Sequence, residues 1–160
     1  MRDTLAVTSL DIFVEDNLKT LYQATSKKVF DIAFESFFAE HLDVTVNGEA
    51  VSRAQYKQEL WCERYAERNA TVAFHGVLAV PSDNEHLNEA GTVAVFLTSA
   101  VQFVAPSGRP TQELVTASYR LIIEQDKSVE HHGERAQILE IRKVTSVDVV
   151  VGRKDESEDL

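Results

Sequence analysis

Histidine and tyrosine are the side chains in this sequence with the clearest capacity for proton transfer, because both can donate and accept a proton. Tyr119 lies on the same face of its predicted strand as the apolar residues Val115 and Leu121. Its ring is therefore expected to face the core, and its hydroxyl to need a buried partner. Its role is then that of a core tyrosine or of a ligand contact. His75 alternates with Phe74 and is assigned to the outer face, which suits a dimer contact better than catalysis. The weak catalytic candidates are His75, Tyr119 and Tyr56.

Other reactive side chains form weaker patterns. His131, His132 and Glu134 are near neighbours in a turn, where side chains seldom converge on one ion, so no metal site is expected. Cys62 is the only cysteine and is expected to be a small buried side chain, because no activating partner is identifiable. The sequence contains no glycine-rich phosphate loop and no serine nucleophile motif, and no cofactor is expected.

The first half of the chain has the periodicity of helices. Ser52 and Gln55 have the spacing of a capping box at the start of one helix. Asn47-Gly48 lies between two short alternating runs and predicts a type I′ hairpin turn. Helices are expected over residues 9–22, 27–40 and 53–68, with the hairpin over residues 42–51. The second helix carries an apolar stripe of four phenylalanines: Phe30, Phe34, Phe37 and Phe38.

Four long strand-like runs fill the second half, over residues 71–80, 92–104, 112–125 and 135–151. The last run is longer than a typical strand, so a bulge or bend is expected near residues 143–146. Helices followed by a meander of strands favour a curved antiparallel sheet with three helices on its concave face. The predicted fold class is α+β, in the order α-α-β-β-α-β-β-β-β.

The outer face of this sheet is expected to pack against a second copy of the chain. In the first long run, Phe74, Leu78 and Val80 are assigned inward, with the small or polar alternate residues outward. A sheet face in water normally alternates with charged residues, yet the outer candidates carry almost none. A solvent face of short side chains is the alternative. The expected homodimer interface comprises Ala73, His75, Phe96, Thr98, Thr116 and Arg120.

Composition and charge exclude several classes of protein. At 160 residues the chain is expected to form one domain. Its formal net charge of −10 argues against nucleic-acid binding, which usually needs a basic face. No run approaches the roughly 18 apolar residues of a membrane span, and the start lacks a signal-peptide pattern, so no membrane association and a cytoplasmic location are expected. Residues 153–160 are expected to be an acidic disordered tail.

The element order resembles the nuclear transport factor 2-like superfamily, which includes SnoaL-like polyketide cyclases, ketosteroid isomerase and scytalone dehydratase. The stretch over residues 37–48, FFAEHLDVTVNG, resembles the end of the family's second helix and its first strand, and the helix opening at residues 52–56, SRAQY, continues the resemblance. It covers residues 8–152 and implies a single cone-shaped domain. The family's fold hosts many activities, so the resemblance implies shape more than chemistry.

The family's catalytic residues do not carry over cleanly. Ketosteroid isomerase has a carboxylate general base at the end of its first strand. The matching positions here are Asn47 and Gly48, neither of which can abstract a proton. Asp43 is expected to face solvent. Glu49 could act as the base only if its side chain turned into the pocket. Scytalone dehydratase-like chemistry needs histidine and tyrosine groups around a cavity. The candidates for these groups are His75, Tyr22, Tyr56, Tyr65 and Tyr119.

We therefore expect a SnoaL-like pocket protein for an apolar or aromatic, polyketide-like compound. The pocket is expected between the second helix, the third helix and the sheet. As an enzyme it would be a lyase or isomerase, acting as a cyclase, dehydratase or isomerase, with no identifiable base. The alternative is a non-catalytic dimeric adaptor that binds another protein. The expected ligand-binding residues are Phe34, Phe38, Tyr56, Trp61 and Tyr119.

Overall fold

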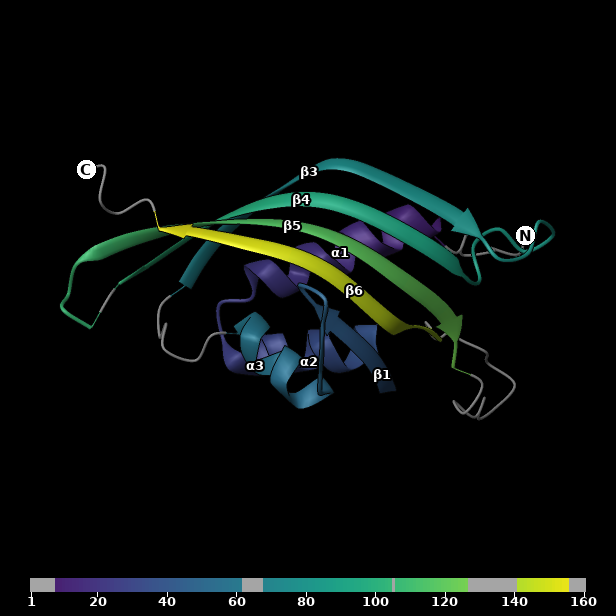
Figure 1. The fold of residues 1–160 in the computed structure, drawn as a ribbon, viewed down its shortest axis with the longest axis horizontal. Coiled ribbons are helices and arrows are strands. Elements are labelled where there is room, and N and C mark those ends of the chain that lie inside the picture. The colour runs from purple at the N-terminus through teal and green to yellow at the C-terminus, as the bar shows by residue number, and fades with distance from the viewer. Residues whose placement is uncertain (1–7, 62–67, 105, 127–140, 156–160) are drawn as a thin grey trace, which may run out of the picture.

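The computed structural model describes residues 8–61, 68–104, 106–126 and 141–155. These residues form three helices and a six-stranded curved sheet, and Figure 1 shows the helices on the side toward which the strands bend. The α+β class and the order of the elements are confirmed. None of the described helices is long and apolar enough to cross a membrane. The elements are α1 (Leu10–Gln23), α2 (Lys27–Phe37), β1 (Phe38–Val46), β2 (Glu49–Val51), α3 (Arg53–Trp61), β3 (Arg68–Pro81), β4 (Gly91–Val104), β5 (Pro110–Gln125) and β6 (Arg142–Asp155).

The strands lie in the order β2-β1-β6-β5-β4-β3. Strands β3 to β6 form the expected antiparallel meander. The expectation of an entirely antiparallel sheet is wrong, because β1 pairs with β6 in parallel, with Val44 opposite Val147. The chain leaves the β1–β2 hairpin through α3 and starts the meander at the far edge of the sheet. The last strand of the meander therefore returns beside β1 in the same direction.

Helix α2 ends three residues earlier than predicted, at Phe37. Phe38 is already extended and pairs with Val144 of β6. The Lys143 ammonium donates to the last-turn carbonyl oxygens of Glu35 and Ser36, at 2.9 and 2.8 Å. These oxygens have no partner within the helix, so the lysine satisfies them as the chain turns into the sheet. Strand pairing therefore prevails over the helical spacing of the phenylalanines.

The capping box and the hairpin turn form as predicted. The backbone N–H of Gln55 donates to the Ser52 hydroxyl oxygen at 3.1 Å. In return, the Gln55 side-chain oxygen accepts from the backbone N–H of Ser52 at 3.0 Å. Asn47 and Gly48 have φ angles of 51° and 83°, as a type I′ turn requires. Helix α3 is described to Trp61 and β3 begins at Arg68, so part of the helix expected over 53–68 lies outside the described residues.

Two β-bulges change the register of the long strands. In β3, Phe74 pairs with Leu97 and Gly76 with Phe96, so His75 is the extra residue. The alternation therefore reverses after His75. Leu78 and Val80, assigned to the core from the sequence, are instead 65% and 55% exposed, while Val77 and Ala79 pack against the core.

The second bulge lies where the sequence predicted it, in β6. Ile122 pairs with Ser146 and Ile123 with Val144, so Thr145 is the extra residue. Strand β6 runs to Asp155, beyond the expected domain end at residue 152. Residues 135–140 of the predicted strand and 156–160 of the predicted tail lie outside the described residues.

Candidate functional site: a tyrosine cluster on the inner face of the sheet

Tyr119 points from β5 into the core, as its alternation predicts. It is buried, and its nearest neighbours across the sheet are Val95 and Val149. Its hydroxyl lies 2.6 Å from the hydroxyl of Tyr22, at the end of α1. The expected buried partner of Tyr119 is therefore a second tyrosine. Helical spacing signals this position of Tyr22, because it lies on the same stripe as Val14 and Leu18.

Tyr56 brings a third phenol into the interior from α3. The side chain is 2% exposed, and its hydroxyl has no hydrogen-bond partner among the described residues. Its ring centroid lies 5.6 Å from that of Phe38 and 6.2 Å from that of Phe34. A buried hydroxyl without a partner is uncommon and requires an explanation.

Burial keeps these phenols protonated. It raises the pKa of Tyr119 well above the ordinary value of 10.0, and the charge that a Tyr56 phenolate would carry raises it further. The pKa of Tyr56 is raised by burial first and by Tyr22 second. The nearby Tyr119 hydroxyl acts in the opposite direction and lowers the pKa of Tyr56, although the two hydroxyls do not meet the geometry of a hydrogen bond. The phenols are therefore hydrogen-bond donors at neutral pH and not bases.

Aromatic rings pack around Tyr56 on one side. Phe34 and Phe38 are buried, with ring centroids 4.6 Å apart. Trp61 is partly buried and lies 5.3 Å from Phe30. The five predicted ligand-binding residues thus meet in one region, Phe34, Phe38 and Tyr56 in direct contact and Trp61 through Phe30. Tyr119 joins them through the electrostatic coupling of its hydroxyl with Tyr56.

The inner face of β6 is less covered beyond the tyrosines. On β6, Val149 lies opposite Tyr119, and Val151, the next inward residue, is only partly buried. Ser99 is fully buried on β4, and its hydroxyl has no hydrogen-bond partner among the described residues. We call the partly buried apolar residues at this end the rim: Leu60, Trp61, Val72, Phe103 and Val151.

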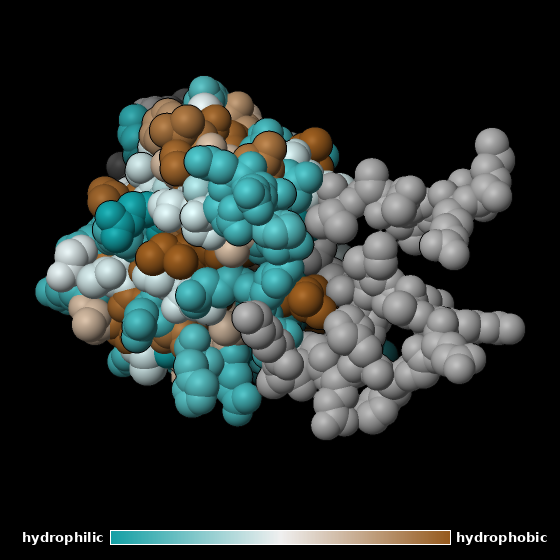
Figure 2. Space-filling model, turned by 90° about the vertical axis from the view of Figure 1, so that its right-hand side faces the viewer, coloured by the Kyte–Doolittle hydropathy of each residue, from teal (hydrophilic) through white to brown (hydrophobic). Residues whose placement is uncertain are grey.

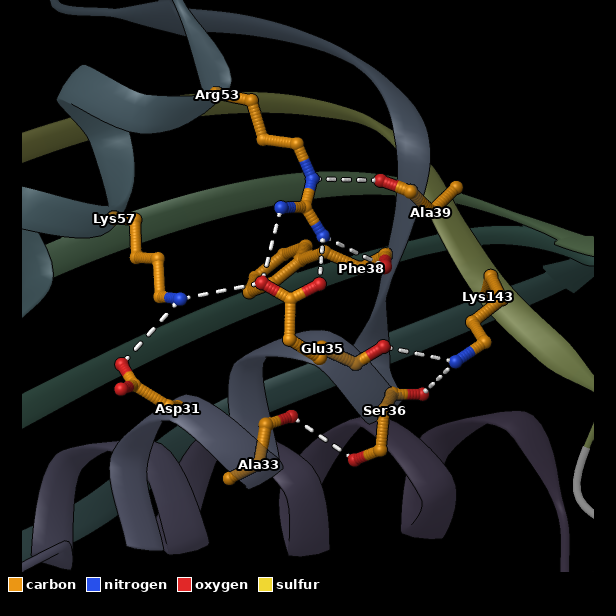
Figure 3. Close-up of polar contacts among 9 residues, drawn as sticks. All are labelled: Asp31, Ala33, Glu35, Ser36, Phe38, Ala39, Arg53, Lys57 and Lys143. Carbon is orange, nitrogen blue, oxygen red and sulfur yellow. Dashed lines mark hydrogen bonds and ion pairs between the residues drawn. The ribbon is translucent and has the colours of Figure 1, made fainter. Parts of the chain in front are cut away.

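A charged network holds α3 against α2 (Figure 3). Tyr56 lies on α3, so the network also helps to position its side chain. The Arg53 guanidinium pairs with Glu35 at 2.9 Å and lies 5.0 Å from the Phe34 ring centroid. Its Nε also donates to the Ala39 carbonyl at 2.9 Å. Lys57 pairs with Glu35 at 3.2 Å and with Asp31 at 3.3 Å. The hydrogen bond from Arg53 is the main cause that lowers the pKa of Glu35.

His75 does not belong to this site. It is exposed on the outer face at the bulge of β3, where its Nε2 lies 2.7 Å from the Thr98 hydroxyl oxygen. The tyrosines lie on the opposite face, so a catalytic role for His75 beside them has no geometric support. Among the other predicted interface residues, Ala73, Phe96 and Arg120 are exposed, and Thr98 and Thr116 are partly exposed.

Asn47, which the resemblance places at the position of the ketosteroid isomerase base, makes hydrogen bonds within the sheet. The Asn47 side chain accepts from the Val151 backbone amide at 2.8 Å and donates to the Val151 carbonyl at 3.1 Å. These bonds fasten the end of β1 to β6. Asp43 and Glu49 are exposed. The described residues contain no group of three acidic, histidine or cysteine side chains that could hold a metal ion. Cys62, Tyr65 and the predicted turn at His131, His132 and Glu134 lie outside them.

Two hollows in the described surface lie away from the tyrosines. One of about 540 Å³ is lined by Glu40, His41, Glu124 and Lys143, among others. One of about 330 Å³ lies beside Asp16, Ser36 and Lys143. Both are open, and neither is the expected apolar pocket between α2, α3 and the sheet.

Comparisons with known proteins identify the fold only. No protein-family model and no curated protein matches the chain. The chain is similar to the crystal structure of a conserved protein from Planctomyces limnophilus DSM 3776, with a TM-score of 0.52 and 11% sequence identity. The match covers 91% of this chain and 96% of that one. The shared fold therefore extends over nearly the whole of both chains.

Proposed function

We propose that this protein binds a small apolar molecule on the inner face of its sheet, beside Tyr56, as a SnoaL-like member of the nuclear transport factor 2-like superfamily. The observation that carries the proposal is the buried Tyr56 hydroxyl without a partner among the described residues. Leaving such a group unpaired costs about 1–3 kcal/mol. A ligand oxygen that accepts its hydrogen bond removes this cost.

The surroundings of Tyr56 indicate the class of ligand. Its aromatic neighbours favour an apolar or aromatic molecule, and its hydroxyl favours one with a ketone or hydroxyl oxygen. We propose a neutral ligand, because a charged ligand would need a buried side chain of opposite charge. Arg142 is the buried charged residue of the described structure, and its guanidinium is already used elsewhere. That guanidinium donates to the carbonyl oxygens of Thr8 and Asn88. Polyketide-like compounds meet these requirements, and the rim is the entry that we propose for them.

The chemistry that the site supports is polarisation of a ligand oxygen. Phenol donors in a dry site stabilise negative charge that develops on a carbonyl oxygen. A cyclase, dehydratase or isomerase also needs a base, and the buried polar side chains of the described structure are Ser99, Arg142 and the tyrosines. Ligand binding is therefore the core of the proposal. Lyase or isomerase activity is its extension, for which the base is unassigned.

A dimeric protein-interaction adaptor is the second candidate. The observation that favours it is the mutual packing of Phe34, Phe38 and Tyr56, since rings that fill the interior leave a ligand less room. Both candidates include pairing with a second copy of the chain and the cone shape of the family. Binding of a small molecule near Tyr56 distinguishes them.

Thermal-shift screening of aromatic ketones, polyketide-like compounds and steroids tests the proposal. We expect at least one compound to raise the melting temperature of the wild-type protein. Tyr56→Phe keeps the ring and removes the unpaired hydroxyl, so it should keep or raise the unliganded stability and lose most of the ligand-induced shift. Ser99→Ala is the matched control, because it removes another unpaired buried hydroxyl.

The proposal fails if no compound shifts the wild-type transition, and the adaptor then becomes the better candidate. An equal shift for wild type and Tyr56→Phe, with direct binding shown by calorimetry, places the ligand elsewhere on the protein. A shift lost in Ser99→Ala but kept in Tyr56→Phe would assign the ligand contact to Ser99 and contradict the choice of Tyr56.

A further inference from the structure

The turn at Asn47 and Gly48 places a reactive side-chain amide beside an unshielded backbone nitrogen. Asn47 is the only one of the five asparagines in the sequence that is followed by glycine. Both turn residues are exposed, and a Cβ at Gly48 would meet no atom within 4 Å. Within the described ranges, no backbone hydrogen bond of a turn or loop uses the Gly48 N–H. Water and the Asn47 side chain can therefore both reach the Gly48 nitrogen.

This arrangement supports an intramolecular acyl transfer. The Gly48 nitrogen attacks the side-chain carbonyl carbon of Asn47, and the new C–N bond closes a cyclic imide. The Cγ–Nδ2 bond breaks, and ammonia leaves with the proton of the Gly48 amide. Water then adds to one of the two imide carbonyls and opens the ring to aspartate or to isoaspartate. The net reaction replaces an amide with a carboxylate and consumes only water, and glycine favours it because it has no Cβ to crowd the attack.

The folded hairpin restrains this reaction. The Asn47 Oδ1 accepts from the Val151 backbone N–H at 2.8 Å, and its Nδ2 donates to the Val151 carbonyl oxygen at 3.1 Å. The Asn47 backbone N–H donates to the Val149 carbonyl oxygen at 2.9 Å. These bonds hold the side chain against β6, whereas ring closure needs its carbonyl carbon at bonding distance from the Gly48 nitrogen. The side chain must therefore leave Val151 first, so the reaction belongs to a locally opened hairpin.

Either product loses a bond that fastens β1 to β6. An aspartate at position 47 has no side-chain N–H to donate, and its second carboxylate oxygen would lie against the Val151 carbonyl oxygen. Isoaspartate also routes the main chain through the former side chain and so lengthens the turn. Val46 pairs with Glu49 across a two-residue connection, and this register has no place for the longer backbone. The hairpin therefore cannot return to its original pairing with β6.

We infer that Asn47 is a site of spontaneous deamidation, and that this modification releases the β1–β2 hairpin from the end of β6. The parallel ladder ends at the pair of Val46 and Val149, and the Asn47 side chain extends the attachment to Val151. The inference goes beyond the proposed function, because the reaction needs only water and no ligand of the tyrosine cluster takes part. Opening of this hairpin thereby limits the lifetime of the intact protein.

Peptide mapping by mass spectrometry on the full chain, incubated at mildly alkaline pH, tests the site. We expect the peptide that contains Asn47 to gain the mass of an amide-to-acid exchange and to yield isoaspartate as well as aspartate. Asn84 is the matched internal control, because it is exposed but followed by Glu85, whose N–H donates to the Asp83 carboxylate at 2.8 Å. The loop between β3 and β4 lies at the right of Figure 1 and on the side that faces the viewer in Figure 2, where hydrophilic atoms are prominent. Asn84 should remain an amide while Asn47 is converted.

The same conversion measured in guanidinium chloride tests the restraint by Val151. We expect Asn47 to react roughly tenfold or more faster in the unfolded chain, because each of the two side-chain hydrogen bonds slows the opening by about fivefold.

Melting temperatures test the release of the hairpin. Asn47→Asp should lower the melting temperature by about 2–6 °C, because it removes one hydrogen bond and opposes two acceptor oxygens. Asn84→Asp makes the same change of charge in an exposed loop and should leave the melting temperature unchanged. Deamidated wild-type protein, separated from the intact form by ion exchange, gives the same measurement without a folding step of the variant.

Conversion of Asn47 no faster than that of Asn84 overturns the site. Equal rates in the folded and unfolded chains overturn the restraint by Val151. An unchanged melting temperature, in both Asn47→Asp and the deamidated wild-type protein, overturns the release of the hairpin.

Discussion

The three phenols of the interior differ in what their hydroxyls meet. Tyr22 and Tyr119 share a 2.6 Å hydrogen bond, which satisfies the polar group that each brings into the core. The Tyr56 hydroxyl shares the same dry environment and lacks such a bond among the described residues. A buried polar group without a hydrogen-bond partner is uncommon in folded proteins. That difference makes Tyr56 the centre of the candidate site and Tyr22–Tyr119 its support.

Alkaline pH should unfold the protein through its tyrosines. The pKa values of Tyr56 and Tyr119 are raised in the folded state, so above about pH 10 the unfolded chain ionises these phenols while the folded protein keeps them protonated. Their contribution to stability is complete below pH 10 and decreases as the pH rises above it. We expect tyrosinate absorbance and loss of secondary structure to change together in an alkaline titration.

The variant Tyr56→Phe provides the control for this titration, because it removes one raised phenol and should weaken the pH dependence. Tyrosines that ionise along an ordinary curve in a protein that remains folded would contradict the burial of these hydroxyls.

Single residues show where the sequence was sufficient and where it was not. The inward position of Tyr119 follows from its apolar alternates, a local pattern that the sequence displays directly. Its partner Tyr22 lies 97 positions away, and no local rule pairs the two. Asn47 was recognised as a turn residue, yet its hydrogen bonds to Val151 span 104 positions and depend on the parallel pairing of β1 with β6.

At the scale of elements, strand pairing decided the points that periodicity left open. The phenylalanine stripe continues helical spacing through Phe38, but that residue pairs with Val144 and begins a strand. The face of Leu78 depends on one extra residue at His75, which neither composition nor alternation reveals. The bulge in β6 was predictable because the strand-like run over residues 135–151 is longer than a typical strand. The length of a strand-like run can be read from the sequence, whereas the register of a strand depends on its pairing with the neighbouring strand.

Gly91 should prove essential where β4 begins. A Cβ at this position would press on the Val80 carbonyl oxygen and lie 2.9 Å from the Leu10 Cδ1. The backbone of β3 cannot yield easily because Pro81 pairs with Gly91. We expect Gly91→Ala to lower the free energy of unfolding by about 1–3 kcal/mol, measured by urea denaturation.

Gly152→Ala is the matched control for this substitution, because a Cβ there meets no atom within 4 Å. Loss of conformational freedom in the unfolded chain should leave that variant unchanged or stabilise it by less than about 1 kcal/mol. Equal stability of the two variants would show that α1 and β3 adjust to the added methyl group, and would contradict a tight junction at Gly91.

The whole molecule presents two different surfaces of one sheet. The inner face holds the helices, the aromatic rings and the tyrosines. The outer face holds exposed apolar side chains over β3 and β4 and exposed charged side chains on β5 and β6, among them Arg120, Glu124, Asp148 and Lys154. The proposed ligand site lies on the first face and the proposed pairing involves the second, so each proposal is testable by variants that leave the other face untouched.

Salt should strengthen the proposed dimer. Each chain has a formal net charge of −10, so two chains repel each other over long range, while the outer face over β3 and β4, which we expect to form the contact, carries exposed apolar side chains. The Debye length falls from about 30 Å at 0.01 M salt to about 10 Å at 0.1 M, which screens this repulsion and leaves the apolar contact in place. We expect the dissociation constant, measured by sedimentation velocity, to fall across this range.

Arg120→Ala should keep the same trend, because one peripheral charge contributes little beside the net charge of the chains. A dimer that weakens as salt is added would have an interface held by ion pairs, and the outer face of β3 and β4 could not be its centre.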